Sequence, residues 1–309
     1  MSKENTAVTK KKIKRCKEDV VFDAACFIIL TLVLFVVAYP LYWVIISSIS
    51  APSAVSSGKV LLHPIGFTLK GYAEVFKNDQ VMRGFLNSLI ITFCGVMVNL
   101  IVTLPTSYAL SRSNFSGKKP ITIFYLITMF FSGGLIPTYL VIQRLQMLNT
   151  IWALILPGCL SVYNMIVART FFKSNISEEL YEAAEIDGCT QARFFFQIAL
   201  PLSKAIIAIL VLYYGVGHWN SYFSALVYIS DKAKYPLQLV LRNILITNQT
   251  ALSQTATTAA ARAALQEKQQ LIDVMKYSLI IISSIPVLVM YPLVQKHFVK
   301  GVMIGSMKG

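Results

Sequence analysis

Two long apolar stretches of the sequence carry polar side chains in their interiors. Tyr163 and Asn164 interrupt the first, and the run Gly-Val-Gly-His-Trp-Asn-Ser-Tyr at 215–222 interrupts the second. Polar groups buried in an apolar span are costly unless they face a bundle interior or a wet cavity. Aromatic rings can stack on the flat faces of a solute, and amide, imidazole and hydroxyl groups can hydrogen-bond its polar groups. The candidate residues of a solute path are Asn164, His218, Trp219, Asn220 and Tyr222.

The same side chains have a purely structural interpretation of equal weight. Polar residues inside apolar helices also hydrogen-bond neighbouring helices, and tryptophan and tyrosine gather at membrane interfaces. Gly215 and Gly217 loosen the helix beside them under either interpretation.

Motifs for catalysis, nucleotide binding and metal binding are absent from the sequence. It contains no phosphate-binding G-x-x-x-x-G-K-[ST], no H-E-x-x-H and no G-x-S-x-G, and its five cysteines form no C-x-x-C pair. Carboxylates are nearly missing from the apolar stretches, apart from Asp23 at an edge. Ion-coupled transporters usually need buried acids or broken-helix ion sites. We therefore expect no enzyme activity, no cofactor and no transport powered by the chain itself.

The elements that would position these residues are membrane helices. The chain has a mean hydropathy of +0.63, with 56% hydrophobic and 14% charged residues. Its net charge of +14 comes from basic residues that flank apolar spans, which indicates membrane flanks and not nucleic-acid binding. Continuous apolar runs of about 20 residues predict helices that cross a bilayer. The fold prediction is an all-α integral membrane protein with six transmembrane helices, at about 22–48, 85–110, 121–140, 151–172, 205–229 and 274–294.

The basic residues also predict an orientation. With both termini in the cytoplasm, the inner segments carry more lysine and arginine than the outer ones, in agreement with the positive-inside rule. The predicted domains are a basic cytoplasmic tail at 1–20, a transmembrane domain at 21–294 and a cytoplasmic tail at 295–309. Within the membrane domain, 173–203 is a cytoplasmic loop and 230–273 an extracytoplasmic insertion in which Thr258–Gln270 could form a helix.

The segment 177–201 is a polar island in this apolar chain. Ser177 is a good N-cap, Glu178 and Glu179 favour the first turn of a helix, and Gly188 is a typical C-terminal stop. A second helical run, 192–199, leads to Pro201. From pattern alone, the segment is a short surface helix, a sharp turn and a return to the membrane, which any cytoplasmic loop could adopt.

The amino-acid sequence of this segment resembles a motif of a known protein family. Glu182-Ala183-Ala184, then Gly188, Ile198 and Leu200-Pro201 resemble the EAA loop of ATP-binding-cassette (ABC) importer permeases. The resemblance implies a type I ABC importer permease fold, in which this loop is a coupling helix that docks in a cleft of an ATPase. Its contact residues here would be Glu182, Ala183, Ala184, Asp187 and Gly188. Cys189 departs from the commoner alanine.

Other stretches resemble maltose-permease-like sugar permeases. The run Met-Phe-Phe-Ser-Gly-Gly-Leu-Ile-Pro-Thr-Tyr at 129–139 resembles a subgroup that handles oligosaccharides or polysaccharide fragments, and its glycines and proline permit close helix packing or a local break. The end of the chain resembles a tail that reaches the ATPases, with Lys300, Gly301 and Gly305 at the contact.

The resemblance implies four kinds of partner. They are a second, related permease, two ATP-binding ATPase subunits, an extracytoplasmic solute-binding protein and a carbohydrate substrate, with membrane lipid around the bundle. The expected function is the permease subunit of an ATP-driven carbohydrate importer in the plasma membrane. The alternative is an ion-coupled secondary transporter or channel.

Overall fold

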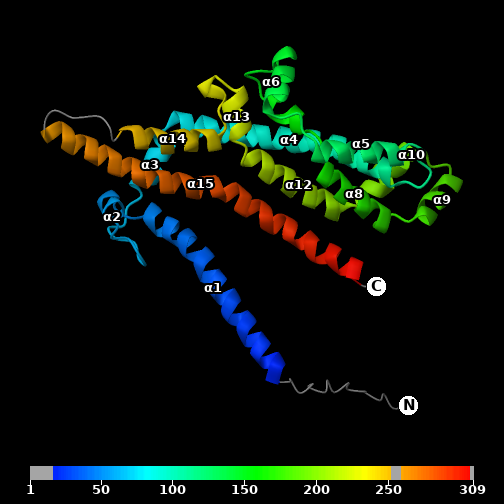
Figure 1. Ribbon diagram of the computed structural model, residues 1–309, viewed down its shortest axis with the longest axis horizontal. Helices are drawn as coiled ribbons and strands as arrows, with labels where there is room; N and C mark the ends of the chain where they lie inside the picture. The colour runs from blue at the N-terminus through cyan, green and yellow to red at the C-terminus, as the bar shows by residue number, and fades with distance from the viewer. Residues whose placement is uncertain (1–16, 252–258, 307–309) are drawn as a thin grey trace.

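The computed structural model describes residues 17–251 and 259–306, and within these ranges it contains helices and no strands. Figure 1 shows most of the long helices lying roughly along one axis, with short helices at both ends and on one side. The longer elements are α1 (Lys17–Ser48), α4 (Asp79–Ser111), α5 (Lys118–Phe130), α8 (Val162–Asn175), α12 (Lys204–Trp219), α14 (Leu237–Ala251) and α15 (Ala259–Ser306). The shorter elements are α2 (Pro52–Ser56), α3 (Lys70–Lys77), α6 (Leu135–Arg144), α7 (Trp152–Ile155), η1 (Leu156–Gly158), α9 (Glu178–Ile186), α10 (Gln191–Phe194), the π-helical η2 (Phe195–Ala199), α11 (Leu200–Leu202), α13 (Phe223–Tyr228) and η3 (Lys232–Lys234).

The helices long and apolar enough to cross a membrane fall into two groups. Within the part of the chain that the structure describes, three are single helices, at Lys17–Ser48, Asp79–Ser111 and Gln269–Pro292, and three are bent pairs that reach this length only when both parts are counted together. The pairs are Lys118–Phe130 with Leu135–Arg144, Trp152–Gly158 with Val162–Asn175, and Gln191–Leu202 with Lys204–Trp219, bent by 113°, 52° and 79°. The all-α membrane fold is confirmed, and the number of six crossings stays a prediction.

The break in the third predicted span comes from its glycines. Between α5 and α6 the chain leaves the helix at Phe131, and Gly134 adopts φ +86° and ψ −178°, a conformation reserved for glycine. A Cβ added at Gly134 would meet no atom within 4 Å. The predicted local break is therefore confirmed, whereas no close helix packing occurs at this glycine.

Three other predicted boundaries differ from the structure. The fourth span is not one continuous helix, because η1 ends at Gly158 and Ser161 starts α8 by accepting a hydrogen bond from the backbone N–H of Asn164. The fifth span ends at Trp219, where the chain turns before α13. The described part of 230–273 is largely helical, because it holds α14 and the start of α15, and α15 then runs without interruption to Ser306.

Helix α4 forms the centre of the bundle and packs against α8, α12 and α14, while α15 packs against α1, α3 and α12. Close packing depends on small residues: a Cβ at Gly71 of α3 would lie 2.5 Å from Oγ of Ser278, and one at Gly84 of α4 would lie 3.0 Å from Val240. Asn78 begins α4 by accepting hydrogen bonds from two backbone N–H groups of its first turn.

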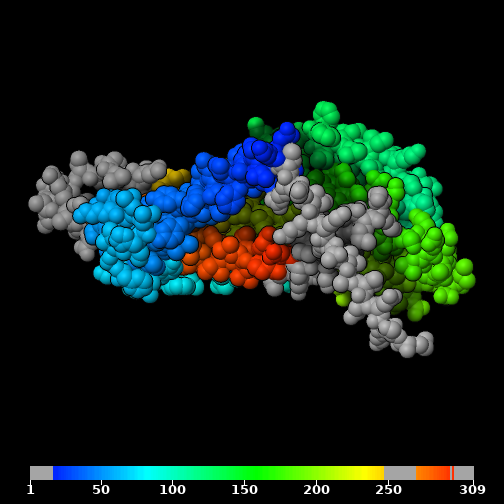
Figure 2. All heavy atoms as spheres, turned by 90° about the horizontal axis from the view of Figure 1, so that it is seen from below, coloured from blue at the N-terminus to red at the C-terminus, as the bar shows by residue number. Residues whose placement is uncertain are grey.

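Helix α1 stands apart from the bundle over most of its length. Its end contacts α15, where the Trp43 and Tyr277 rings meet edge to face at 5.1 Å and Ser278 donates a hydrogen bond to the backbone oxygen of Ser48. Towards its beginning, α1 diverges from α15 (Figure 1), and its apolar side chains are exposed. Seen from below (Figure 2), α1 lies beside α2 and α3 at one end and runs to one side of α15.

Candidate functional site

The predicted surface helix is α9, which lies with α10 at the end of the molecule opposite α2, α3 and α14 (Figure 1). Ser177 caps its start by accepting a hydrogen bond from the backbone N–H of Leu180 at 3.3 Å, and Glu178 and Glu179 occupy the first turn. The helix therefore begins as predicted from the sequence, because capping and the helix dipole act locally.

The end of α9 is a Schellman motif, which orders the turn at Gly188. The backbone N–H of Gly188 bonds Glu185, and that of Cys189 bonds Ala184, at 3.0 and 2.9 Å. Gly188 adopts φ +75°, and a Cβ there would meet no neighbour within 4 Å. Glycine is therefore needed at this position for its backbone conformation and not for space.

The two faces of α9 differ in what they contact. Tyr181 is buried against the ring of Phe194 from α10, with 5.3 Å between ring centroids, and Ala184 packs on the same apolar cluster. Glu182, Ala183 and Asp187 are exposed, and Ile186 is 87% exposed. The two alanines of the EAA motif thus have different surroundings: Ala184 packs on the apolar cluster, and Ala183 is exposed.

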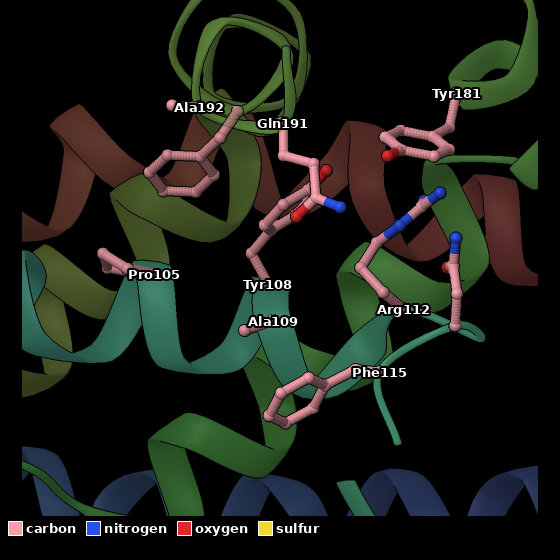
Figure 3. A pocket seen from close by; sticks show the side chains of 10 residues that line it. Pro105, Tyr108, Ala109, Arg112, Phe115, Tyr181, Gln191 and Ala192 are labelled. Atoms are coloured by element: carbon pink, nitrogen blue, oxygen red, sulfur yellow. The ribbon is translucent and has the colours of Figure 1, made fainter. Parts of the chain in front are cut away.

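A cavity of about 290 Å³ lies between α9, α10 and the end of α4. Figure 3 shows Tyr108, Arg112, Tyr181 and Gln191 pointing towards one another around it. The Arg112 Nη2 atom lies 2.6 Å from Oε2 of Glu178, so α4 and α9 are joined by an ion pair. The sequence analysis did not identify Arg112 or Ile186. In the sequence, Arg112 is an ordinary basic residue beside an apolar span, and Ile186 is one apolar residue among many.

The predicted solute-path residues lie in different environments. Asn164 is buried in the first turn of α8. Trp219 is 1% exposed, and its Nε1 donates a hydrogen bond to the backbone oxygen of Ser283 on α15 at 2.8 Å. Asn220 and Tyr222 are exposed at the turn between α12 and α13.

His218 is partly buried beside α4. Its Nε2 atom lies 2.7 Å from Oδ1 of Asn99, and the Asn99 amide donates a hydrogen bond to the backbone oxygen of Gly158. His218 and Trp219 therefore join helices in this conformation, while Asn220 and Tyr222 lie at the surface. Asn99 had no place in the sequence analysis, although a lone asparagine within an apolar span is a signal of such a contact.

The remaining predicted contact residues are Lys300, Gly301 and Gly305. They lie in the last turns of α15, within its helical backbone. No group of three or more His, Cys, Asp or Glu side chains that could hold a metal ion occurs among residues 17–251 and 259–306.

Comparison with known proteins shows to which class of protein the chain belongs. No family model matches the chain. It is 36% identical over 288 residues to the polygalacturonan/rhamnogalacturonan transport system permease protein YtcP of Bacillus subtilis, covering 93% of this chain and 98% of that protein. It is 39% identical over 289 residues to protein LplC of the same organism, covering 94% and 95%.

A solved structure agrees in fold. A chain in the crystal structure of a bacterial ABC transporter that imports the acidic polysaccharide alginate superposes with a TM-score of 0.82 and 27% sequence identity, over 92% of this chain and 99% of that one. The fold and the relatives define a permease subunit of a transporter, which is not itself catalytic. The chain belongs to the permease family of ABC importers for sugars and oligosaccharides. The alternative of an ion-coupled transporter or channel is not favoured.

Proposed function

We propose that α9 is the coupling helix through which partner ATPases drive this permease, with Glu182, Ala183, Ala184, Asp187 and Gly188 at or beside the contact. The observation that carries the proposal is the bare outer face of α9, where Ile186 projects beside Glu182 and Ala183. A large apolar side chain gains free energy when a partner covers it, and the acidic neighbours can pair with basic groups of a cleft. The capped ends of α9 keep it rigid under load.

The importer around this subunit contains a second, related permease, two ATPases and an extracytoplasmic solute-binding protein. This chain forms half of the translocation path, and ATP hydrolysis resides on the ATPases. Support for a second permease comes from the unpartnered apolar faces of α1 and of the break between α5 and α6, where Phe130, Phe131 and Ile136 are exposed.

The end that carries α9 faces the cytoplasm, and both termini lie on the same side. Figure 1 shows that the start of α1 and the end of α15 both point towards the half of the molecule that holds α9, which supports this topology. The last turns of α15 then bring Lys300, Gly301 and Gly305 to the ATPases. The segment 230–273 faces the outside, within reach of the solute-binding protein.

The cargo is an oligosaccharide, and Asn164, His218, Trp219, Asn220 and Tyr222 line its path in at least one state of the transport cycle. The exposed Tyr222 ring and Asn220 amide are the groups available to a sugar in the conformation described here. One matched protein is named for polygalacturonan and rhamnogalacturonan and another for alginate, so fragments of these polysaccharides are the first cargo to test.

The coupling role is tested with Glu182→Lys and Gly188→Val in the assembled importer reconstituted in vesicles. Both variants are expected to lower sugar uptake at least tenfold at equal expression, because one reverses a charge at the contact and the other strains the turn that orients α9. Gly58→Val is the matched control, since Gly58 also has a positive φ, of +70°, and open space around it, but lies at the opposite end. Normal uptake by both α9 variants would overturn the proposal.

A further inference from the structure

The contact between α9 and α4 is concentrated on one guanidinium group. Arg112 follows α4 directly, and its Nη2 atom lies 2.6 Å from Oε2 of Glu178 in the first turn of α9. The Arg112 side chain is 10% exposed and that of Glu178 is 42% exposed. The second oxygen of the same carboxylate accepts a hydrogen bond from the backbone N–H of Ser113 at 3.1 Å. Both oxygens of Glu178 are thus held by the end of α4.

One turn further along α9, the ring of Tyr181 makes a second contact with Arg112. Glu178 and Tyr181 stand three residues apart, so they share a face of the helix. The Tyr181 ring covers the Arg112 guanidinium, with 4.2 Å between Cζ and the ring centroid, and Tyr108 approaches it at 5.9 Å. Figure 3 shows Arg112 extending from the end of α4 towards Tyr181. The guanidinium therefore holds α9 by its charge and by its flat face at once.

The end of α4 that carries Arg112 is itself fixed by cations. Arg169 of α8 donates a hydrogen bond to the backbone oxygen of Leu110 at 2.9 Å. The Lys118 ammonium donates to the backbone oxygens of Arg112 and Ser113 at 3.2 and 2.8 Å. Positive groups at these carbonyls complement the C-terminal end of the helix dipole. A displacement of Arg112 is thus transmitted to α4 instead of being absorbed by a loose loop.

The opposite face of α9 is free for a partner. Ile186, Glu182 and Ala183 are exposed there, whereas Tyr181 is buried on the inner face. The helix is consequently held on one side by Arg112 and bare on the other. Beyond this contact, α4 carries Asn99, whose hydrogen bonds reach His218 of α12 and Gly158 of η1.

We propose that Arg112 is a positioning residue that passes the displacement of α9 to α4, through the Glu178 carboxylate and the Tyr181 ring. The inference rests on the proposed coupling role of α9 and adds the route by which force enters the membrane bundle. When the contacts of Arg112 with Glu178 and Tyr181 are lost, α9 can still bind an ATPase but can no longer move α4. ATP hydrolysis then continues while sugar uptake falls.

The test compares Arg112→Met, Arg112→Lys and Glu178→Gln with the control Arg144→Met in the complete importer in vesicles. Arg144 is an exposed arginine in the last turn of α6 and contacts none of these groups. The measured quantity is the number of sugars taken up per ATP hydrolysed, together with the amount of ATPase that copurifies. Arg112→Met and Glu178→Gln are expected to lower this ratio at least tenfold with normal copurification. Arg112→Lys keeps the charge but not the flat face, so it gives an intermediate ratio.

A merely structural role would reduce the yield of folded complex and leave the transport ratio of the remaining complex unchanged. Glu178→Gln keeps the test decisive if Arg112→Met does not assemble, because the neutral amide of a half-exposed side chain can still accept the hydrogen bond from Ser113. An unchanged ratio in Glu178→Gln overturns the inference. If Glu182→Lys uncouples the importer and Arg112→Met does not, coupling by α9 stands and the Arg112 route is wrong. If neither variant changes the ratio, the coupling role itself is wrong.

Discussion

The Nε2 atom of His218 lies 2.7 Å from Oδ1 of Asn99, and this pair joins α12 to α4 inside the bundle. The Asn99 amide nitrogen donates a hydrogen bond to the backbone oxygen of Gly158, at 2.8 Å. Because a carbonyl oxygen can only accept, the amide orientation is fixed, and Nε2 of His218 must carry the proton that Oδ1 accepts. One asparagine thus ties together two membrane helices and the break in the fourth predicted span.

Gly95 gives this arrangement its first test. It lies one turn before Asn99 on α4, and a Cβ added there would lie 2.5 Å from Nε2 of His218. Gly95→Ala is therefore expected to push the imidazole away from Asn99 and to destabilise the protein by about 1–3 kcal/mol, the usual cost of overpacking. Thermal unfolding of the purified protein in detergent measures the change.

Gly217→Ala is the matched control for Gly95→Ala. Both glycines lie in apolar helices, but a Cβ at Gly217 would meet nothing within 4 Å. Alanine is the better helix former by about 1 kcal/mol, so this variant should unfold at the same temperature or higher. Equal destabilisation by the two substitutions would contradict the close contact between Gly95 and His218.

The break between α5 and α6 makes a second prediction. Gly134 combines φ +86° with ψ −178°, which costs a residue with a Cβ about 1–3 kcal/mol. Gly134→Ala should therefore lower the unfolding temperature, although the added Cβ would meet no atom within 4 Å. Gly133 does not have a positive φ, so Gly133→Ala should lower the unfolding temperature less. If both variants melt like the parent protein, the sharp turn at Gly134 is not a fixed feature of the fold.

Local signals in the sequence accounted for much of the fold. Ser177 and Gly188 predicted both ends of α9, because capping and glycine stops depend only on neighbouring residues. The break near Ser161 was missed, although Pro157 and Gly158 are a turn signal and Ser161 is a good N-cap. In an apolar run of span length, hydropathy hides such breaks because both halves are equally apolar.

Contacts between distant residues escaped the sequence entirely. Arg112 and Glu178 are 66 positions apart, and each has an ordinary local interpretation, as a basic flank and as a first-turn acid. Asn99 and His218 are 119 positions apart. A single sequence contains no record of such pairings, so the solute-path prediction could name His218 but not the partner that holds it.

The predicted solute path makes a third test, because its residues differ in burial. Trp219 is fully buried, meets Phe85 edge to face at 5.6 Å and donates to Ser283, so Trp219→Ala should destabilise the protein by about 3–5 kcal/mol. Tyr222 is 43% exposed, so Tyr222→Ala should lower the unfolding temperature much less than Trp219→Ala does. If Tyr222 contacts the sugar, its loss raises the KM for uptake severalfold, as expected from a lost stacking contact.

Uptake kinetics over a range of sugar concentrations separate the two effects. Tyr213→Ala is the control, because Tyr213 is a tyrosine of α12 with the same exposed fraction, 43%, but lies outside the predicted solute path. The KM of Tyr213→Ala should stay unchanged. An unchanged KM in Tyr222→Ala, or an equal rise in both variants, would remove Tyr222 from the path.

The exposed face of α9 makes the last prediction. Ile186 is 87% exposed, so Ile186→Ser removes little buried apolar surface from this chain and should change its stability very little. If an ATPase covers this side chain, its loss weakens the contact by about 1.5–3 kcal/mol, or roughly ten- to a hundredfold in affinity. Titration of purified ATPase onto the reconstituted permease pair measures this affinity. Phe67→Ser is the control, because Phe67 is also a largely exposed apolar residue (71%) but lies at the far end, so this variant should bind the ATPase normally. Equal affinity of the Ile186→Ser and Phe67→Ser variants for the ATPase would show that the ATPase does not bind the outer face of α9.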